Sequence, residues 1–163
     1  MPISARGEVR KSSFAQAVKV LGYPAVAAPE KVLKRTDSIG HIARTLLEDF
    51  QRDLGTPRVY QVYQPKVDRD GTIAGVEALL RWNHPEFGHV IPSAIVNIAE
   101  ETSVIRQLGE WTIDRALEAM VAWRAEGCRV FPISVNVSPV QLEHASLVGV
   151  VKSLVEKHGL TPA

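Results

Sequence analysis

Cysteine is nearly absent from the sequence: Cys128 is the only one among 163 residues, so no disulfide bond can form within the chain. A chain of this length buries roughly 70% of the surface that its unfolded form exposes, and a hydrophobic core can therefore stabilise it without disulfides or a structural metal. The 45% hydrophobic and 23% charged residues are typical of a soluble globular protein and exclude a largely disordered chain. A lone cysteine fits a reducing compartment, and we expect a cytoplasmic protein.

Long apolar runs and an excess of one charge are also missing. No stretch of about eighteen apolar residues occurs, and the nearest approach, Ala15 to Ala28, is interrupted by Lys19, Gly22 and Pro24, so we expect no membrane span. The 19 basic and 18 acidic side chains nearly cancel, which gives no reason to expect a nucleic acid polymer or an anionic membrane as a partner. Any phosphate-containing ligand has to be held by local groups.

The first 37 residues differ from the rest in charge. Seven basic side chains stand against three acidic ones, a balance of +4, and because the whole chain carries +1 the remainder carries −3. Three prolines and weak periodicity also mark this segment. We therefore expect residues 1–37 to form a poorly ordered basic leader and residues 38–163 to form the folded part.

Apolar residues at steps of three and four predict a series of helices after this leader. Asp37 or Ser38 is suited to cap the first helix, and Ser138 with Gln141 has the spacing of a capping box. The expected helices run from Ser38 to Leu54, from Pro92 to about Glu101, from Thr102 or Ser103 to Gly127, onward from Ser138, and from about Leu147 to Gly159.

Three segments of suitable composition predict strands: Arg58–Val67, Ile73–Trp82 and Val130–Val137. Asp70-Gly71 predicts a tight turn between the first two, and a loop is expected around residues 83–88. Because strands alternate with helices, the pattern predicts an α/β fold with buried, mainly parallel strands.

Strand alternation places polar side chains on one face of each predicted strand. A carboxylate on an interior face is costly unless it is paired or binds a cation, so Glu77 needs a partner. Arg81 shares its face but lies roughly 13 Å along an extended strand, too far for direct pairing. The polar faces are those of Gln64 and Lys66, of Glu77, Leu79 and Arg81, and of Ser134 and Asn136.

The residues by themselves leave two interpretations of Glu77 open. A divalent cation held by the Glu77 carboxylate and the Asn136 amide oxygen is one, because hard cations such as Mg²⁺ prefer oxygen ligands. A solvated or arginine-paired Glu77 is the other. Periodicity does not decide between them.

Six short motifs stand out between Tyr63 and Leu142. They are Tyr63-Gln64-Pro65-Lys66-Val67-Asp68, Gly75-Val76-Glu77-Ala78-Leu79-Leu80-Arg81-Trp82, Pro92-Ser93, Ala99-Glu100-Glu101-Thr102, Gly109-Glu110-Trp111, and Ser134-Val135-Asn136-Val137-Ser138-Pro139 with Gln141-Leu142. In their order and spacing they resemble the EAL-domain cyclic di-GMP phosphodiesterases. The likeness extends from the helix near Leu46 to the end of the chain.

The resemblance implies a (β/α)₈ TIM-type barrel whose first strand is antiparallel, preceded by a helix. It implies hydrolysis of cyclic di-GMP to linear pGpG with Mg²⁺ or Mn²⁺. By the motif match, Glu77 is the metal-ligating, catalytic acid and Asn136 a second metal ligand. Arg81 corresponds to the arginine that clamps a substrate phosphate, and Gln64 and Leu79 to residues that contact the ligand.

The family pattern continues with acids that these residues do not include. It has a further metal-ligating glutamate, a paired aspartate motif, an active-site lysine and another acid after a segment like the one that ends at Ala163. One carboxylate and one amide cannot hold two divalent ions, since Mg²⁺ keeps its own water readily. Residues 38–163 are then expected to be the N-terminal half of an EAL domain, a partial barrel that is truncated and inactive as this chain alone.

Half a barrel leaves strand edges unpaired, so we expect either a homo-oligomer or a part of a longer chain. The alternative function is a non-catalytic module that binds cyclic di-GMP or docks a protein partner. Two other features have structural interpretations: His84 is expected to shape its loop rather than bind metal, and Trp82, Trp111 and Trp123 to pack helices and core.

Overall fold

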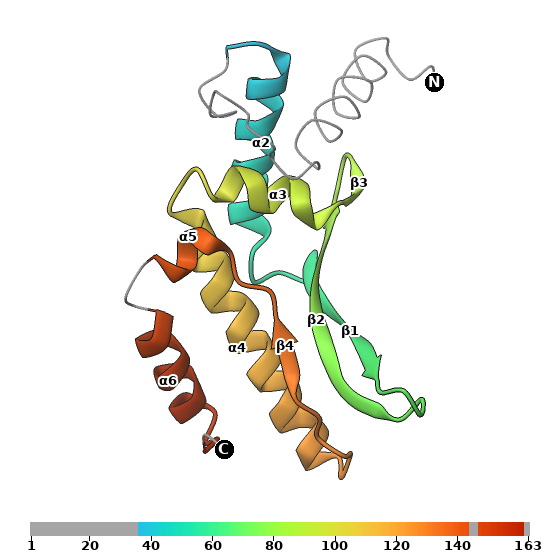
Figure 1. Ribbon diagram of the computed structural model, residues 1–163. Helices are drawn as coiled ribbons and strands as arrows, with labels where there is room; N and C mark the ends of the chain where they lie inside the picture. The colour runs from blue at the N-terminus through green and yellow to red at the C-terminus, as the bar shows by residue number, and fades with distance from the viewer. Residues whose placement is uncertain (1–35, 144–146, 162–163) are drawn as a thin grey trace. The chain divides into compact units, whose positions relative to one another are not determined.

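The computed structural model describes residues 36–143 and 147–161 of the chain (Figure 1). Among these, residues 36–60 and 81–104 form one compact unit, and residues 61–80, 105–143 and 147–161 form a second. The predicted basic leader, residues 1–37, lies outside the described residues except for its last two, so its order stays a prediction.

Helices and strands follow one another largely in the predicted order. The helices are α2 (Ser38–Asp53), α3 (Pro92–Ala99), α4 (Val104–Ala125), α5 (Pro139–Leu142) and α6 (Leu147–Lys157). The strands are β1 (Val59–Val67), β2 (Ile73–His84), β3 (Gly88–Val90) and β4 (Ile133–Val135), which is shorter than the predicted Val130–Val137. No helix in the described ranges is long and apolar enough to cross a membrane.

The predicted hairpin of β1 and β2 is confirmed. The prediction of buried, mainly parallel strands is wrong for the described residues, because β2 is antiparallel to β1 and β3 and only β4 pairs with it in parallel. β1 and β2 are neighbours in the sheet. At the open end Asn83 N donates to Arg58 O (2.9 Å), and at the turn Asp68 N donates to Thr72 O (2.9 Å), so the strands are antiparallel. Gly71 has a φ of +79°, a conformation that favours glycine and allows the tight turn.

The loop predicted around residues 83–88 is confirmed as a turn at residues 85–87, but it is shorter than predicted because strands flank it on both sides. β2 continues to His84, and β3 pairs with it in antiparallel register, with Trp82 opposite Val90 and His84 opposite Gly88. Gly88, at a φ of +71°, allows the chain to reverse within three residues. His84 closes the same turn, because its Nδ1 accepts hydrogen bonds from the backbone N–H groups of Glu86 (3.1 Å) and Phe87 (3.2 Å).

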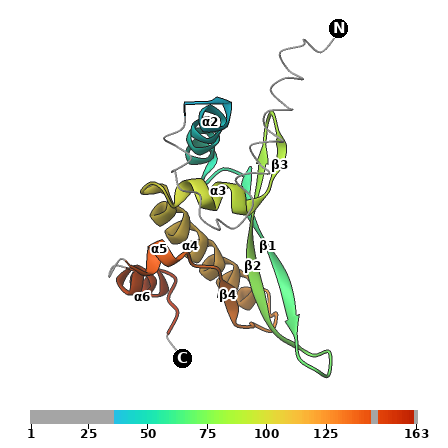
Figure 2. The ribbon, with the colours of Figure 1, turned by 45° about the horizontal axis from the view of Figure 1, so that its top comes forward.

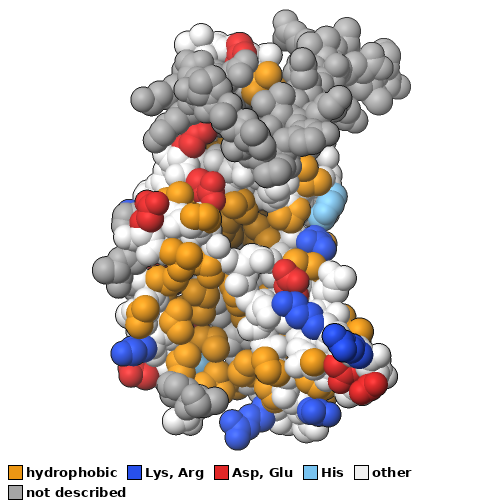
Figure 3. Space-filling view, viewed as in Figure 1, with side chains coloured by type: hydrophobic (Ala, Val, Ile, Leu, Met, Phe, Trp, Pro, Cys, Tyr) orange, Lys and Arg blue, Asp and Glu red, His pale blue; other side chains and the backbone are white. Residues whose placement is uncertain are grey.

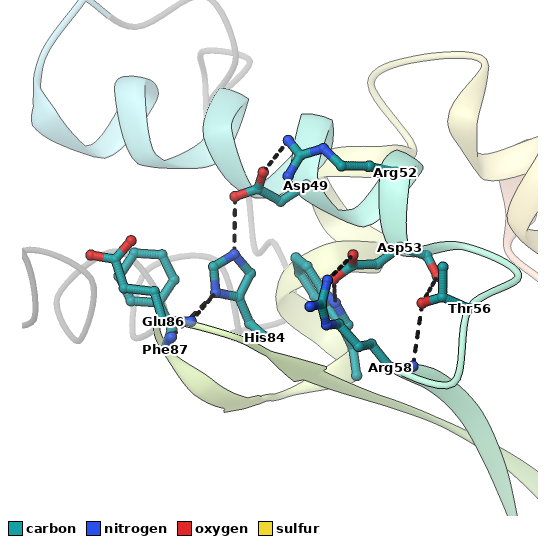
Figure 4. Close-up of polar contacts among 9 residues, drawn as sticks. Asp49, Arg52, Asp53, Thr56, Arg58, His84, Glu86 and Phe87 are labelled. Atoms are coloured by element: carbon teal, nitrogen blue, oxygen red, sulfur yellow. Dashed lines mark hydrogen bonds and ion pairs between the residues drawn. The ribbon is translucent and has the colours of Figure 1, made fainter.

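The first unit is organised around a buried tryptophan on β2. Trp82 is 1% exposed and makes an edge-to-face contact with Phe50 of α2, with 5.2 Å between ring centroids. Its indole Nε1–H donates to Asp53 Oδ2 (3.0 Å). Arg58 Nη1 lies 3.1 Å from Asp53 Oδ1 (Figure 4). α2 also contacts α3. The packing role expected of Trp82 is thus confirmed.

His84 joins the same helix to the β2–β3 turn. Because Nδ1 accepts from two backbone amides, the proton lies on Nε2, which donates to Asp49 Oδ2 at 3.0 Å (Figure 4). Both ring nitrogens are therefore used in the fold. The predicted loop-shaping role of His84 is confirmed.

In the second unit, one face of β1 packs on α4. Gln61 Nε2 donates to the Thr112 carbonyl (3.1 Å), and the Tyr63 hydroxyl donates to the Arg115 carbonyl (3.3 Å). Tyr63 also makes an edge-to-face contact with Trp123, with centroids 4.8 Å apart. Since side chains alternate along a strand, this contact turns the even-numbered side chains of β1 away from α4.

β4 is followed directly by α5, whose start matches the sequence prediction. Ser138 Oγ accepts from Val140 N (3.2 Å), and the Gln141 side chain accepts from Ser138 N (2.9 Å), which completes a capping box. A Cβ added at Gly109 of α4 would lie 1.6 Å from Gln141 Nε2, so only glycine admits the Gln141 side chain. This close approach fixes α5, and with it the end of β4, on α4.

α6 lies alongside α4 (Figures 1 and 2). Asp114 of α4 accepts from Lys157 Nζ (2.9 Å) and contacts His158 Nε2 (2.7 Å) just after α6. Val148 and Val151 of α6 are exposed, and Figure 3 shows hydrophobic side chains gathered over this helix.

Candidate functional site

The structure brings together the two predicted metal ligands, Glu77 and Asn136. β4 pairs parallel to β2 with Glu77 opposite Ser134, so Asn136 lies on the same face of the sheet two residues farther along. Asn136 Nδ2 donates to Glu77 Oε1 at 2.8 Å. Residues 59 positions apart in the sequence thus become direct partners.

Lys66 is a second partner of Glu77, which the sequence analysis did not assign to the site. Its Nζ lies 3.8 Å from Glu77 Oε2. Strand alternation already placed Lys66 on the same face as Gln64, and the Asp70-Gly71 turn predicted that β1 lies next to β2. Together these two signals were sufficient to place a cationic side chain near Glu77, but the partners predicted from the sequence were an arginine and a divalent cation.

The face that carries Glu77 is partly open to solvent. The Glu77 side chain is 31% exposed and that of Lys66 47%, and Gln64 and Asn136 are also exposed. The expectation of an interior Glu77 is wrong for this chain, because no element within residues 36–143 or 147–161 buries the face. The desolvation cost that called for a cation is therefore small, and the amide and ammonium partners satisfy the carboxylate.

The remaining predicted site residues lie on β1 and β2. Gln64 and Leu79 fall on the same faces of their strands as Lys66 and Glu77. Arg81 follows Leu79 by two residues, is partly buried, and belongs to the first compact unit. Their contacts with a ligand stay predictions.

Glu77 and Asn136 fit a hard divalent cation in kind but not in number. A carboxylate and an amide are suitable oxygen donors for Mg²⁺ or Mn²⁺. Within the described ranges, however, no group of three or more His, Cys, Asp or Glu side chains is arranged to hold a metal ion. Asn136 also presents its NH₂ to Glu77, so its oxygen becomes available beside the carboxylate only after that hydrogen bond breaks.

The shifted pKa values belong to other carboxylates. Burial raises the pKa of Asp114, but hydrogen bonds from Lys157 and His158 outweigh it, and the pKa is lowered from 3.8. Burial likewise raises the pKa of Asp49, while hydrogen bonds with His84 and Arg52 lower it overall. Burial, and then the charge of Glu118, raise the pKa of Tyr63. Asp114, Asp49 and Tyr63 hold helices and strands together. The candidate functional site is therefore Glu77 with its two partners, Asn136 and Lys66.

Comparison with known proteins identifies the family. The family model named EAL domain matches residues 47–163. The bifunctional diguanylate cyclase/cyclic di-GMP phosphodiesterase MucR of Pseudomonas aeruginosa is 40% identical over 119 residues, which are 72% of this chain and 17% of MucR. Cyclic di-GMP phosphodiesterase PA2567 of the same organism is 39% identical over 106 residues, 64% of this chain and 18% of that protein.

Solved structures show the same relationship. The PaMucR phosphodiesterase in its c-di-GMP complex superimposes with a TM-score of 0.67 at 40% identity, over 72% of this chain and 48% of that one. The cGMP-bound form of the EAL enzyme Bd1971 gives a TM-score of 0.66 at 28% identity, over 95% of this chain and 42% of that one. The chain thus spans about half of each solved chain and under a fifth of each curated relative.

The hairpin of β1 and β2, the parallel strand β4 and the Glu77–Asn136 contact occur within the matched residues. The chain belongs to the EAL domain family.

Proposed function

We propose that this chain supplies part of a cyclic di-GMP phosphodiesterase site, with Glu77 as the metal-ligating, catalytic acid and Asn136 as a second ligand. The observation that carries the proposal is the 2.8 Å contact between these side chains, which come from motifs far apart in the sequence. The relatives named as cyclic di-GMP phosphodiesterases support the choice of substrate. The complex of PaMucR with c-di-GMP supports it further.

The proposed roles follow from the chemistry of each side chain. A bound Mg²⁺ or Mn²⁺ would polarise the scissile phosphate and lower the pKa of a bound water. Arg81 donates a forked, charge-assisted pair of hydrogen bonds to a phosphate of cyclic di-GMP, which lysine does not reproduce. Gln64 and Leu79 contact the ligand on the same strands. The product is linear pGpG.

The proposed architecture is a partial (β/α)₈ barrel of the EAL type, with β1 as its antiparallel first strand and β2 and β4 as its first parallel strands. Parallel strands are normally covered on both faces, whereas the Glu77 face is partly exposed here. The remaining cover and ligands come from a longer polypeptide or a second copy of the chain. We place this protein in the cytoplasm.

These residues alone are proposed not to hydrolyse cyclic di-GMP. Glu77 is the only carboxylate of the proposed ligand pair, and one carboxylate does not neutralise two divalent ions. The purified chain, incubated with cyclic di-GMP in Mg²⁺ or Mn²⁺, should yield no pGpG by liquid chromatography. Turnover that Glu77→Gln abolishes would refute this proposal of inactivity.

Binding tests the substrate assignment separately. The chain should bind cyclic di-GMP weakly in isothermal titration calorimetry, and Arg81→Lys should weaken binding about tenfold, because the forked hydrogen bonds are lost. Arg106→Lys, at an exposed position of α4, is the matched control and should change nothing. Equal affinities for wild type and Arg81→Lys would contradict the role of Arg81.

A non-catalytic binding or docking module is the second candidate function. The exposure of the Glu77 face favours it, because hydrolytic sites usually exclude bulk water from the reacting groups. The two candidates differ once the missing ligands are supplied, by a longer polypeptide or by a second copy of the chain. Cyclic di-GMP binding without turnover in that assembly would favour the module, and turnover would favour the phosphodiesterase.

A further inference from the structure

Lys66 lies next to Glu77 but has no part in the site as proposed above. Lys66 Nζ lies 3.8 Å from Glu77 Oε2, and Asn136 Nδ2 lies 2.8 Å from Glu77 Oε1. Each carboxylate oxygen therefore already has a partner from this chain. Since each oxygen keeps a second lone pair, a divalent cation that binds Glu77 either shares an oxygen with one of these partners or displaces it.

We propose that Lys66 is a displaceable counterion of Glu77. Its ammonium group neutralises the carboxylate in the cation-free chain and moves away when a divalent cation binds, so that Lys66 sets the cation affinity of the site. This inference rests on the proposed function, since it requires Glu77 to be a cation ligand. Lys66 acts through Glu77 and is a positioning residue.

The geometry favours displacement of Lys66 over a fixed role. Its side chain is 47% exposed and carries the ammonium on a flexible four-carbon stem, so the group can turn into solvent. At 3.8 Å the contact is a loose ion pair rather than a short hydrogen bond. Exposed pairs of this kind contribute little to stability, and breaking one costs correspondingly little.

Charge separates the two partners of Glu77. Asn136 is neutral and offers a ligand oxygen once it has turned, whereas Lys66 offers only a positive charge that repels the incoming cation. Removing that charge should tighten cation binding about fivefold at low salt, which is the scale of an ion pair of this exposure. The effect should shrink as ionic strength rises, because salt screens exposed charges.

The competing interpretation is that Lys66 holds the Glu77 carboxylate in place. Removing the side chain would then weaken cation binding, whatever the salt concentration. The two interpretations therefore predict opposite signs for the same variant. Lys66→Arg distinguishes them further, because arginine retains the charge and should keep the wild-type affinity.

The experiment is a titration with Mg²⁺ alone, followed by NMR at the Asn136 side-chain amide. Four forms are compared: wild type, Lys66→Met, Lys66→Arg and the control Lys152→Met. Lys152 is an exposed lysine of α6, so its loss changes the net charge equally without touching Glu77. We expect tightening of about fivefold for Lys66→Met only, and a ratio near one in about 0.5 M salt.

A Lys66→Met variant with unchanged or weakened Mg²⁺ binding would overturn the inference, as would equal tightening by Lys152→Met. Glu77→Gln separates this failure from failure of the proposed function. If Glu77→Gln abolishes the Mg²⁺ response at Asn136 but Lys66→Met does not tighten it, only the role of Lys66 is wrong. If Glu77→Gln leaves the Mg²⁺ response intact, Glu77 is not the ligand and both proposals are wrong. If wild type shows no response, Lys66 sets no cation affinity in this chain and only the inference is overturned, because the proposed function takes further ligands from elsewhere.

Discussion

Asp53 and Glu77 are two carboxylates with the same kinds of partner in very different surroundings. Asp53 has a cation, Arg58 at 3.1 Å, and a neutral N–H donor, Trp82 Nε1 at 3.0 Å. Glu77 has Lys66 at 3.8 Å and the Asn136 amide at 2.8 Å. The Asp53 side chain is 3% exposed and that of Glu77 31%.

Burial therefore decides what each carboxylate does. Displacing a partner of Asp53 leaves a charge or an indole N–H away from water, which is costly. Displacing a partner of Glu77 exposes the group to water, which replaces the lost contact. The first arrangement is suited to hold a fold together, and the second to exchange its partners for a ligand.

The largest expected effect comes from Asp53→Ala. This change removes the acceptor of the Trp82 indole and leaves Arg58 without its carboxylate, so the free energy of unfolding should fall by about 3 kcal/mol. Glu77→Ala should lower it by less than about 1 kcal/mol. Urea unfolding monitored by circular dichroism measures both. Equal losses would show that burial does not distinguish the two sites.

Gly109→Ala tests how much the contact between α4 and α5, next to Asn136, contributes to stability. A Cβ at Gly109 would collide with the Gln141 side chain, so the capping box of α5 must shift, at a cost of about 2 kcal/mol. Gly149→Ala is the control, because nothing lies within 4 Å of its Cβ position on α6. That substitution should stabilise the helix by about 0.5–1 kcal/mol, and thermal unfolding of both variants provides the measurement.

Arg58→Met and Lys66→Met test the same comparison by removing the cationic partner of each carboxylate. Arg58→Met should destabilise the chain by about 1.5 kcal/mol, because Asp53 stays buried with only the indole as a partner. Lys66→Met should change stability by less than about 0.5 kcal/mol. Similar unfolding midpoints for the two variants, compared in the same urea series, would contradict the assignment of Asp53 to the structural role.

A small effect is also expected at Asp114, whose side-chain exposure of 17% lies between those of Asp53 and Glu77. Its pKa is lowered from 3.8, since the hydrogen bonds from Lys157 and His158 outweigh the effect of burial. Its contribution to stability is therefore complete above pH 3.8 and is lost as the pH falls below that value through the native pKa.

Asp114→Asn should accordingly make the free energy of unfolding less dependent on pH below pH 3.8. At pH 7 it should lower the free energy of unfolding by about 0.5 kcal/mol. Acid titrations of wild type and variant, followed by circular dichroism, check both parts. If the variant loses stability with falling pH just as wild type does, other carboxylates, such as Asp49 with its lowered pKa, cause the loss of stability in acid.

Local signals in the sequence were sufficient for most elements of the fold. Asp37 caps α2 through its side chain, which accepts from Gly40 N (3.1 Å), and Ser138 with Gln141 forms the capping box. These contacts join residues three positions apart, so the sequence contains all the groups involved. β3 was missed because it has only three residues and depends on Gly88 and on His84 turning its ring back to the chain.

The candidate site, too, is only partly predictable from the sequence. The alternation of side chains along each strand is sufficient to place Gln64, Glu77, Leu79 and Asn136 on matching faces. The contact between Glu77 and Lys66 does not follow from that pattern alone, because alternation along β2 places only Arg81 on the face of Glu77 as a cationic side chain. Lys66 comes from the neighbouring strand, and its distance depends on the register of the hairpin.

The sequence by itself determined the helix starts, the hairpin turn and the membership of the EAL family, since each depends on residues that are near neighbours or on literal motifs. Only the tertiary structure decided that Glu77 is partly exposed and lies between an amide and an ammonium group. Exposure and ion pairing depend on which distant strands lie side by side and on what covers them. A one-dimensional pattern assigns a side chain to a face of its strand, and the packing of the chain determines what that face meets.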